Sequence, residues 1–375
     1  MKKILFFTPY GSFTGSEVVL WTYLQNFDRQ KLRAALYSEQ QGPLTAQLPA
    51  DIPLFTSPFN RSFARKIVSK VTHAMGIKVY ENNIRRVQEQ VKADYWYLNT
   101  VLMFPLSSLA ERLGVKVISQ IHELHSSFES ISYGEMQHAM NYSDLVIGVT
   151  QQICDLATVM GAKRTALLYP VVDLSRKQVS EQQVQELRRK LGIAPGAFVW
   201  TMVGTRIYRK GVDLFPFIAQ AMADQPCHFI WMGNSKPTGL NYLVDSQIKA
   251  LNLPNVSFVD VQTDDYYNYL QLSDGLLMTS REEPFGKIMT EAASLGKPLV
   301  APNAGGAKEF IIPGMGELVA YPAPDQFRTA MLRVMQNPMS YNPVLLTEKS
   351  QQFDAERQVK LWEKTILQLK NTTVS

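Results

Sequence analysis

The sequence predicts an α/β protein with two domains, each built on a parallel β-sheet. Short apolar runs alternate with longer amphipathic segments along both halves of the chain, the pattern of β–α–β units. The length of 375 residues exceeds one ordinary core and suits two domains of roughly 150–200 residues each. No run approaches the roughly 18–20 apolar residues of a membrane span. The cysteines, Cys154 and Cys227, are too far apart in sequence to indicate a disulfide framework, so we expect a cytoplasmic protein.

The first half opens with an apolar strand at residues 4–7, a loop of small residues, and a helix at about 17–27. The glycine spacing in this loop matches neither a dinucleotide fingerprint nor a P-loop. Such a strand-to-helix turn still lets a phosphate or sugar approach the backbone. Further strands are expected at residues 33–37, 53–55, 95–98, 115–120, 145–149 and 165–173, with a helix at 151–159.

His122 follows the predicted strand 115–120. The carboxyl ends of parallel strands form the ligand edge of a sheet, so a histidine here is a candidate binding residue. A structural role in the loop is the alternative. The spacing of His122 and His125 would allow a metal ion, but no third ligand is apparent and we expect no metal.

Residues 60–92 form a basic stretch with apolar residues at roughly helical spacing. Two acidic residues, Glu81 and Glu89, oppose eight basic ones: Arg61, Arg65, Lys66, Lys70, Lys78, Arg85, Arg86 and Lys92. Two interpretations stay open: a solvated helix packed by its apolar side, or a helix facing an anionic membrane or ligand. No nucleic-acid module accompanies the charge.

The second half opens with a strand at residues 198–203, followed by a loop with three cations, Arg206, Arg209 and Lys210. A helix at 212–222 comes next. Cations at a strand end, ahead of a helix N-terminus, suit an anionic diphosphate. Solvated basic residues are the alternative, which the helix dipole disfavours without an anion.

The later strands are expected at residues 228–232, 256–259, 275–278 and 298–301, and helices at 264–272, 285–295 and in two segments of the tail from 343 to 369. Glu283 lies in the loop after strand 275–278, and Glu291 lies on the next helix, with seven residues between them. A flexible glycine pair, Gly305 and Gly306, precedes a short helix.

These motifs resemble the E-x7-E signature of the retaining glycosyltransferases of family 4, the group 1 glycosyltransferases. The resemblance is strong over about residues 195–320 and weaker over 1–170. The matching segments are Glu283-Pro284-Phe285-Gly286, Glu291-Ala292, Gly305-Gly306, Val203-Gly204 and Lys210-Gly211. The family implies a GT-B fold, in which two Rossmann-like domains with parallel sheets face each other across a cleft. Residues 1–172, with a last helix at 354–375 crossing back, would bind the acceptor, and residues 173–353 the donor.

The resemblance also implies roles on the donor side. Glu291 would accept hydrogen bonds from the ribose hydroxyls, and Glu283 would contact the transferred sugar. Lys210, with Arg206 or Arg209, would stabilise the leaving diphosphate by preorganised charge. The family usually has arginine directly after the Val-Gly pair, where this chain has Thr205, so that contact is expected to move to Arg206 or Arg209.

Backbone N–H groups at Phe285, Gly286 and Lys287 would meet the sugar or diphosphate. His122 would lie beside the transferred sugar, and Gly15 in the loop under the diphosphate.

The expected function is a retaining, metal-independent transfer of a sugar from a UDP- or GDP-linked donor to a glycan or lipid-linked acceptor, as in polysaccharide biosynthesis. No cofactor is expected. Peripheral contact of the basic stretch with an anionic membrane stays one of the two open interpretations given above, beside binding of the nucleotide sugar and the acceptor. Retention rests on the family alone, and same-face departure and attack is preferred because no nucleophile carboxylate pair is readable. The alternatives are a nucleotide-sugar epimerase of similar fold and a catalytically silent sugar-binding protein.

Overall fold

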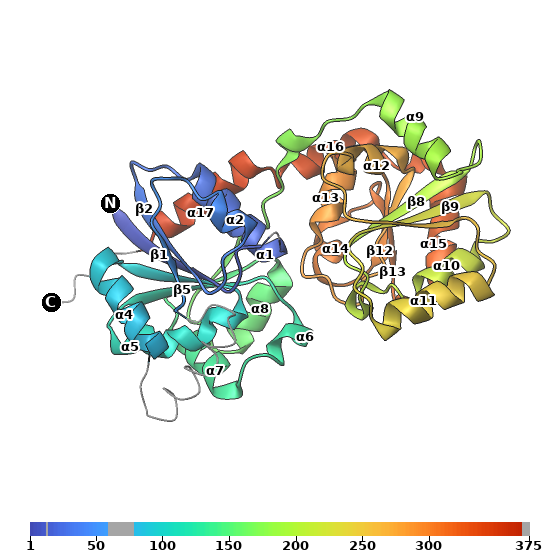
Figure 1. The fold of residues 1–375 in the computed structure, drawn as a ribbon. Coiled ribbons are helices and arrows are strands. Elements are labelled where there is room, and N and C mark those ends of the chain that lie inside the picture. Colours follow the sequence, from blue (N-terminus) through green and yellow to red (C-terminus); the bar gives the residue numbers. More distant parts are fainter. Residues whose placement is uncertain (13, 59–78, 370–375) are drawn as a thin grey trace. The chain divides into compact units, whose positions relative to one another are not determined.

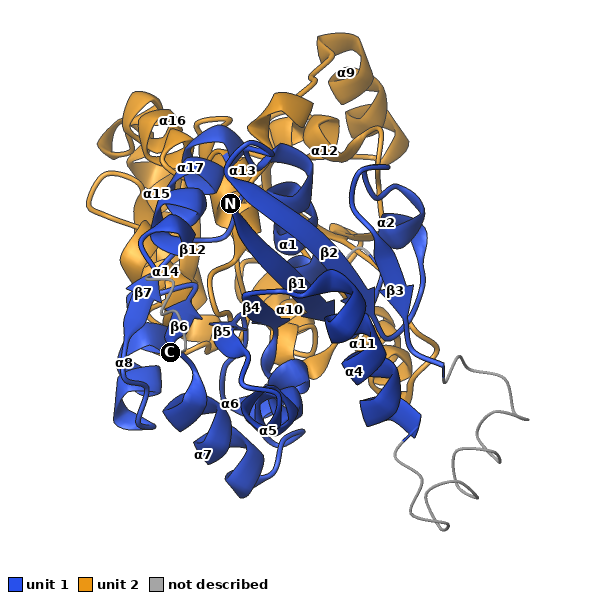
Figure 2. Cartoon of the chain, turned by 90° about the vertical axis from the view of Figure 1, so that its left-hand side faces the viewer, with its two compact units in different colours: residues 1–171, 355–375 blue, residues 172–354 orange. Residues whose placement is uncertain are grey.

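The computed structural model of the chain describes residues 1–12, 14–58 and 79–369 and divides into two compact units (Figures 1 and 2). Unit 1 contains Met1–Val171 and Ala355–Ser375, and unit 2 contains Val172–Asp354. Val172 and Asp354, the first and last residues of unit 2, pair in an isolated parallel β-bridge, so the chain enters and leaves unit 2 at adjacent points. None of the described helices is long and apolar enough to cross a membrane.

Unit 1 has one sheet of seven parallel strands in the order β3-β2-β1-β4-β5-β6-β7. The strands are β1 (Lys2–Thr8), β2 (Leu32–Ser38), β3 (Leu54–Thr56), β4 (Tyr95–Asn99), β5 (Lys116–Ile121), β6 (Leu145–Gly148) and β7 (Thr165–Leu167). The helices are α1 (Gly15–Asn26), α2 (Pro43–Ala46), α4 (Val79–Val91), α5 (Ser107–Arg112), α6 (His125–Phe128), α7 (Tyr133–Tyr142), α8 (Gln151–Val159) and α17 (Ala355–Leu367), with a 3-10 helix η1 (Val101–Leu106).

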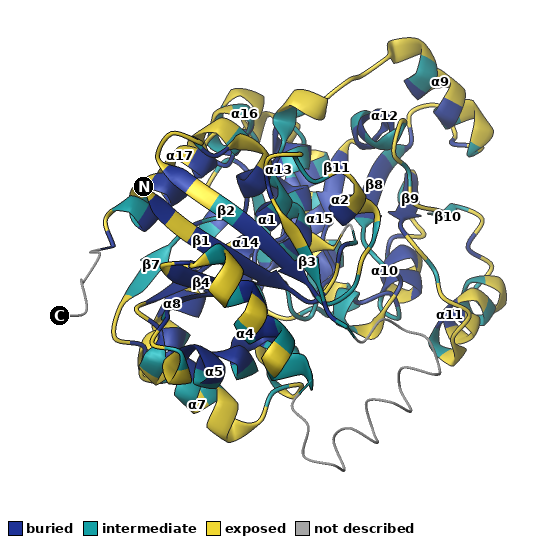
Figure 3. Ribbon diagram, turned by 60° about the vertical axis from the view of Figure 1, so that its left-hand side comes forward, coloured by how far each residue is buried: buried dark blue, intermediate teal, exposed yellow. Residues whose placement is uncertain are grey.

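Alternate residues of the central strands enter two separate cores, one on each face of this sheet. Leu5 and Phe7 of β1 belong to the core covered by α4, α5, α7 and α8. Ile4 and Phe6 belong to the core covered by α1 and α17. Residues 4–7 of β1 are buried on both faces of the sheet (Figure 3) and form an uninterrupted apolar run, whereas Lys3 is exposed.

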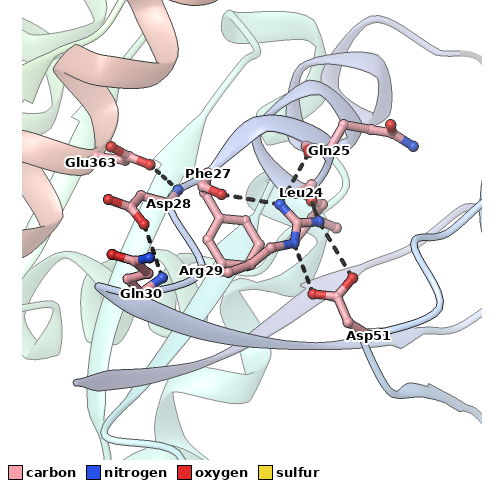
Figure 4. Close-up of polar contacts among 8 residues, drawn as sticks. All are labelled: Leu24, Gln25, Phe27, Asp28, Arg29, Gln30, Asp51 and Glu363. Carbon is pink, nitrogen blue, oxygen red and sulfur yellow. Dashed lines mark hydrogen bonds and ion pairs between the residues drawn. The ribbon is translucent and has the colours of Figure 1, made fainter.

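The C-terminal helix α17 packs on unit 1 although it follows unit 2 in sequence. The Trp362 ring stacks on Tyr23 of α1, with centroids 4.9 Å apart. The Glu363 carboxylate accepts a hydrogen bond from the backbone N–H of Asp28, just beyond α1 (Figure 4). Beside it, Arg29 bonds the last carbonyls of α1 and the carboxylate of Asp51 (2.8 Å). A cation suits a helix C-terminus, so these contacts hold the end of α1 that α17 covers.

Unit 2 has one sheet of six parallel strands in the order β10-β9-β8-β11-β12-β13. The strands are β8 (Phe198–Val203), β9 (Cys227–Met232), β10 (Val256–Val259), β11 (Gly275–Leu277), β12 (Leu299–Pro302) and β13 (Gly316–Val319). The helices are α9 (Glu181–Lys190), α10 (Phe215–Ala221), α11 (Gly239–Ala250), α12 (Tyr266–Leu272), α13 (Lys287–Ala293), α14 (Gly305–Phe310), α15 (Pro324–Gln336) and α16 (Pro343–Gln351), with 3-10 helices η2 (Leu174–Arg176), η3 (Tyr208–Lys210) and η4 (Pro338–Ser340).

Two sequence predictions about elements need comment. The strand predicted at residues 165–173 ends at Leu167, and Pro170 has no N–H with which a longer ladder could continue. Much of the basic stretch, including Arg61, Arg65, Lys66, Lys70 and Lys78, lies outside the described residues. Its contact with a membrane therefore stays a prediction.

Candidate functional site

Most of the predicted site residues lie in two adjacent loops of unit 2. β8 and β11 are neighbouring parallel strands, so their carboxyl ends meet at one edge of the sheet. The loop after β8 ends in η3, and the loop after β11 leads into α13. The sheet thereby brings Lys210 next to Glu283, which is 73 residues later in the sequence.

Hydrogen bonds between the two loops set their spacing. The backbone N–H of Arg281 donates to the carbonyl of Arg209 (2.9 Å), and the guanidinium of Arg209 donates to the carbonyl of Glu282 (2.8 Å). The hydroxyl of Thr279 donates to the carbonyl of Lys210 (2.7 Å). The backbone of η3 is therefore held by residues that follow β11.

Arg281 adds further contacts between the same loops. Its guanidinium forms a bidentate ion pair with Asp213 (2.8 and 2.7 Å) and donates to the carbonyl of Tyr208 (2.7 Å). It also lies 3.9 Å from the centre of the Tyr208 ring, a cation–π contact. A planar guanidinium makes all these contacts together, which an ammonium group cannot.

Lys210 and Glu283 form an ion pair at the centre of this arrangement. The Glu283 carboxylate also accepts a hydrogen bond from the Ser280 hydroxyl (3.1 Å). The side chains of Lys210 and Glu283 are only 15% and 11% exposed. Burial raises the pKa of Glu283, but the charge and hydrogen bond of Lys210, with Arg209 and Ser280, outweigh burial and hold that pKa below its ordinary value. Glu283 is therefore a carboxylate at neutral pH.

Glycines allow the loops to approach this closely. Gly211, directly after Lys210, has a φ of +77°, and a Cβ there would lie 2.2 Å from the carbonyl oxygen of Thr279. Gly305 has a φ of +53°, and its Cβ would lie 2.0 Å from the carbonyl oxygen of Glu283. A larger residue at either position would push the Glu283 loop away.

Glu291 has a different environment from Glu283. Its carboxylate accepts a hydrogen bond from the hydroxyl of Tyr266, on α12, and Lys287 lies one turn earlier on α13. Burial raises the pKa of Glu291, and the charge of Lys287 and the bond from Tyr266 offset only part of that rise. Sequence reasoning missed Tyr266, because nothing in its spacing from Glu291 indicates that α12 and α13 meet there.

Arg206 does not join the other two cations of its loop. Its guanidinium pairs with Asp245 of α11 and lies 3.8 Å from the centre of the Phe258 ring. The residue is 8% exposed. Of the two arginines expected to replace the missing family arginine, the structure places Arg209 beside Glu283 and engages Arg206 with other partners.

Phe285 and Gly286 directly precede α13, and Lys287 is its first residue. The Phe285 ring is 2% exposed and packs against Phe310 and Phe353, with centroids 6.1 and 5.0 Å apart. Gly286 has a left-handed backbone with a φ of +80°. Since the Phe285 side chain is committed to the core, the backbone is what this residue offers to a ligand.

The carboxyl edge of unit 1's sheet holds His122. Its Nε2 lies 2.9 Å from Oδ1 of Asn99, at the end of the neighbouring strand β4, so Nε2 carries a proton that the amide oxygen accepts. The carboxylate of Glu123 accepts from the backbone N–H groups of His122 (2.9 Å) and Val101 (3.4 Å). Between these strands Thr100 has a φ of +83°, which is rare for a β-branched residue. The strand-end argument that singled out His122 would also have found Asn99.

Two acids are buried at this edge without a cation among their hydrogen-bond partners. Glu17 accepts from the hydroxyls of Thr8 (3.2 Å) and Ser16 (2.7 Å). Burial raises the pKa of Glu17, and raises that of Glu123 to about 7.

Gly15, the predicted loop glycine, is the first residue of α1, and a Cβ there would meet nothing within 4 Å.

Metal ligands do not gather at either edge. Over residues 1–12, 14–58 and 79–369, no group of three or more His, Cys, Asp or Glu side chains is placed to hold a metal ion.

Comparison with known proteins agrees with the fold and with the motifs of unit 2. Residues 183–355 match the family model described as glycosyl transferases group 1. Curated relatives include a glycogen synthase of Mycobacterium tuberculosis, 25% identical over 219 residues, or 56% of this chain and 52% of the relative. A D-inositol 3-phosphate glycosyltransferase of Rhodococcus jostii is 27% identical over 216 residues, or 55% of this chain and 47% of the relative.

An uncharacterized glycosyltransferase of Methanocaldococcus jannaschii is 26% identical over 137 residues, or 36% of this chain and 37% of the relative. The matches with these curated relatives thus span between 37% and 52% of the relatives' own lengths.

Solved structures match over the whole chain. Anabaena HepE in complex with UDP and glucose has a TM-score of 0.77 and 22% identity, covering 98% of this chain and 100% of that chain. Sucrose-phosphate synthase from Thermosynechococcus elongatus has a TM-score of 0.76 and 15% identity, covering 98% and 99%. At these identities the likeness shows the fold, which is GT-B. The predicted fold class and the resemblance to group 1 glycosyltransferases are confirmed, and the family match covers nearly all of unit 2.

Proposed function

We propose that this chain is a retaining glycosyltransferase that moves a sugar from a nucleoside-diphosphate donor to a glycan or lipid-linked acceptor without a metal ion. The observation that carries the proposal is the half-buried pair of Lys210 and Glu283, held between two loops at the carboxyl edge of unit 2's sheet. Such a pair offers a cation for a phosphate and a carboxylate for sugar hydroxyls within one small region.

The reaction breaks the bond between the sugar's anomeric carbon and the diphosphate oxygen, which leaves with the electron pair. The acceptor oxygen forms the new bond on the same face, and its proton passes to the departing phosphate oxygen. Negative charge grows on the diphosphate, so cations fixed beforehand stabilise the transition state more than the ground state. Lys210 and Arg209 supply this charge in our proposal.

Because Lys210 contacts Glu283, binding of the diphosphate to Lys210 would change the hydrogen bonding of Glu283. When a diphosphate reaches Lys210, the ammonium group shares its hydrogen bonds between two anions, and Glu283 loses part of its pairing. Hydroxyl groups of the transferred sugar would then donate to Glu283, restoring hydrogen bonds to a half-buried carboxylate. Diphosphate and sugar are thus recognised together.

The remaining roles follow the family resemblance. Glu291 would accept from the ribose, and the backbone at Phe285, Gly286 and Lys287 would meet the diphosphate or sugar. From unit 1, His122 would serve the transferred sugar and Gly15 the diphosphate, with the acceptor bound by unit 1.

UDP-sugars are the first donors to test. The titles of the HepE structures name UDP, glucose and UDP-glucose as bound molecules, which supports a uridine diphosphate donor for a chain of the same fold. GDP-sugars are the second choice, since no residue described above selects the base.

The test is a panel of UDP- and GDP-sugars incubated with purified protein, with and without candidate acceptors, in buffer containing EDTA. Release of the nucleoside diphosphate, with an acceptor product whose anomeric configuration matches the donor by NMR, is the expected result. Conversion of one nucleotide sugar into another without release of nucleotide would show an epimerase instead. Binding without any turnover would indicate a silent protein, and inverted configuration would overturn retention.

Variants of the two glutamates sharpen the assignment. Glu291→Gln should raise the Kd for UDP roughly tenfold or more, because a charged hydrogen-bond acceptor is lost. Glu283→Gln should leave UDP binding near the wild-type value and weaken UDP-sugar binding. Equal effects of both variants on UDP and UDP-sugar would contradict the division of roles.

A further inference from the structure

Tyr266 lies outside the predicted site and contacts one of its residues directly. Its phenol is half-buried at the start of α12 and donates its proton to Oε2 of Glu291 on α13. Burial, followed by the nearby charge of Glu291, raises the pKa of Tyr266 well above its ordinary value, so the phenol stays a donor. The direction of this hydrogen bond is therefore fixed.

The backbone of Tyr266 is held independently of this bond. The side chain of Asn268 accepts from the backbone N–H of Ser180 (2.9 Å), and Gln183 donates to Asp265 (3.3 Å). These contacts fasten the first turn of α12 to the start of α9. Removing one oxygen atom from Tyr266 should therefore leave the helix where it is.

The two oxygens of the Glu291 carboxylate are not equivalent. Oε2 accepts from Tyr266, whereas Oε1 has no hydrogen-bond donor among the residues that the structure describes. The carboxylate is only partly buried. Lys287, one turn earlier, contributes charge without forming an ion pair with Glu291. One oxygen is thus anchored by the protein, and the other is left to accept from a ligand.

We propose that Tyr266 is a positioning residue for ribose recognition: by holding Oε2 of Glu291, it aims Oε1 at the ribose hydroxyls of the donor nucleotide. The inference rests on the proposed function, since it assumes a nucleotide donor. Because the Glu291 carboxylate is already held in one rotamer, ribose binding costs no side-chain conformational entropy at Glu291. The hydrogen bonds from the ribose hydroxyls then contribute fully to affinity. The bond from Tyr266 also favours the ionised form of Glu291, which accepts more strongly than a protonated acid.

The experiment measures Kd by calorimetry for UDP and for 2′,3′-dideoxy-UDP, and for the GDP pair if GDP binds more tightly. Wild type should prefer the ribonucleotide roughly tenfold or more, as expected for hydrogen bonds to a charged acceptor. In Tyr266→Phe that preference should fall to roughly threefold or less, while the Kd for the dideoxy nucleotide stays unchanged. Turnover at saturating donor should stay near the wild-type value, because Tyr266 acts on binding.

Tyr267→Phe is the matched control. Tyr267 is the next residue of α12 and is 7% exposed, but its hydroxyl does not donate to Glu291. This variant should keep the full ribose preference. Tyr266→Met also lacks the hydroxyl but has a different side chain. It should lose the ribose preference as Tyr266→Phe does, which would show that the loss is not specific to one variant.

The outcomes separate the two proposals. If Tyr266→Phe keeps the wild-type ribose preference, the positioning role is overturned while the proposed function stands. If wild type binds both UDP forms equally, Glu291 does not recognise ribose and the inference is overturned with that assignment. If wild type binds neither UDP nor GDP, the proposed function itself fails.

Discussion

The carboxyl edges of the two sheets carry acidic side chains in opposite electrostatic settings. In unit 2 Glu283 is paired with Lys210 and Asp213 with Arg281, whereas Glu291 accepts from the hydroxyl of Tyr266. At the carboxyl edge of unit 1 three acids hydrogen-bond to hydroxyl or backbone N–H groups, and none of the three forms an ion pair with a residue that the structure describes. These three acids are Glu17, Glu39 and Glu123.

The difference shows what burial does with and without a counter-charge. Without a cation, burial raises the pKa of each of these three acids, which reduces negative charge at that edge. With Lys210 beside it, Glu283 is ionised despite its burial. An edge with cations suits a diphosphate, and an edge with neutral or weakly charged acids suits the hydroxyl groups of an acceptor. This contrast supports the donor's assignment to unit 2 and the acceptor's to unit 1.

The largest effect should come from removing the cation of the unit 2 pair. Lys210→Met should lower kcat roughly 100- to 1,000-fold, because charge stabilisation of the leaving group is lost. The measurement is nucleoside diphosphate release at saturating donor. Lys249→Met, an exposed lysine at the end of α11, should keep full activity. A loss of less than about threefold in Lys210→Met would remove Lys210 from the reaction.

The same variant leaves Glu283 without its cation, so an effect on folding has to be separated from one on catalysis. Lys210→Met combined with Glu283→Gln removes both charges. The double variant should recover the thermal stability that the single variant loses, since an unpaired buried charge costs more than a missing pair. It should not recover turnover.

The contrast between edges also predicts a pH dependence in unit 1. Burial places the pKa of Glu123 at about 7, above its ordinary value, so between about pH 4.5 and 7 the folded protein holds a proton that the unfolded chain has lost. The free energy of unfolding should therefore fall as pH rises through that window, by about 3 kcal/mol in total. Glu123→Gln should remove this fall. Denaturation midpoints at pH 5 and 7, for wild type and variant, measure it.

Glu283 should respond in the opposite direction. Its pKa lies below the ordinary value, so its stabilising effect is fully present above the ordinary pKa and is lost as pH falls through the lowered one. A lower pH should thus weaken the pair of Lys210 and Glu283 in unit 2, while it protonates Glu123 and removes the cost of burying its charge. The assignment of the pH effect to Glu123 would be contradicted if wild type and Glu123→Gln had the same slope of unfolding free energy against pH from 5 to 7.

Much of the fold was predictable because buried parallel strands are continuous apolar runs. The predicted segments 198–203, 256–259 and 151–159 coincide with β8, β10 and α8. β13 was missed, since three of its four residues are only partly buried and its sequence, Gly-Glu-Leu-Val, has no clear apolar pattern. The helix predicted from residue 285 begins at Lys287, because Gly286 has a left-handed backbone.

The site was predictable where strand ends supply its residues and unpredictable where helices supply them. Lys210 and Glu283 follow strands whose carboxyl ends meet, which topology alone indicates. Arg206 lies in the same loop, yet its side chain pairs with Asp245 on α11, 39 residues later. Nothing in local spacing reveals which cation of a loop a neighbouring helix will engage, and the Tyr266 contact with Glu291 was missed for the same reason.

A smaller effect is expected for the contacts that hold the unit 2 loops together. Arg281→Lys keeps the charge but loses the bidentate bond to Asp213 and the ring contact with Tyr208, and should lower the free energy of unfolding by about 2 kcal/mol. Arg333→Lys is the control, because its pair with Glu317 is made by a side chain that is 63% exposed and should cost about 0–1 kcal/mol. Thermal denaturation compares them. Equal losses would show that the Arg281 contacts do not hold the loop.

The smallest effect should come from unit 1, where His122 forms a neutral hydrogen bond with Asn99. Asn99→Ala removes the oxygen that accepts from Nε2 and should lower kcat/KM roughly three- to tenfold, the value of a single hydrogen bond of about 1 kcal/mol. Asn26→Ala, which loses the hydrogen bond from the side-chain amide to the Thr22 carbonyl at the exposed end of α1, should leave activity unchanged. Steady-state kinetics at several donor concentrations provide the comparison. Since Asn99 is fully buried, thermal stability should be followed alongside, and wild-type kcat/KM in a folded Asn99→Ala would mean that the orientation of His122 does not matter to the reaction. A loss above about a hundredfold would instead place Asn99 itself against a substrate, because the loss of a neutral hydrogen bond has a far smaller effect.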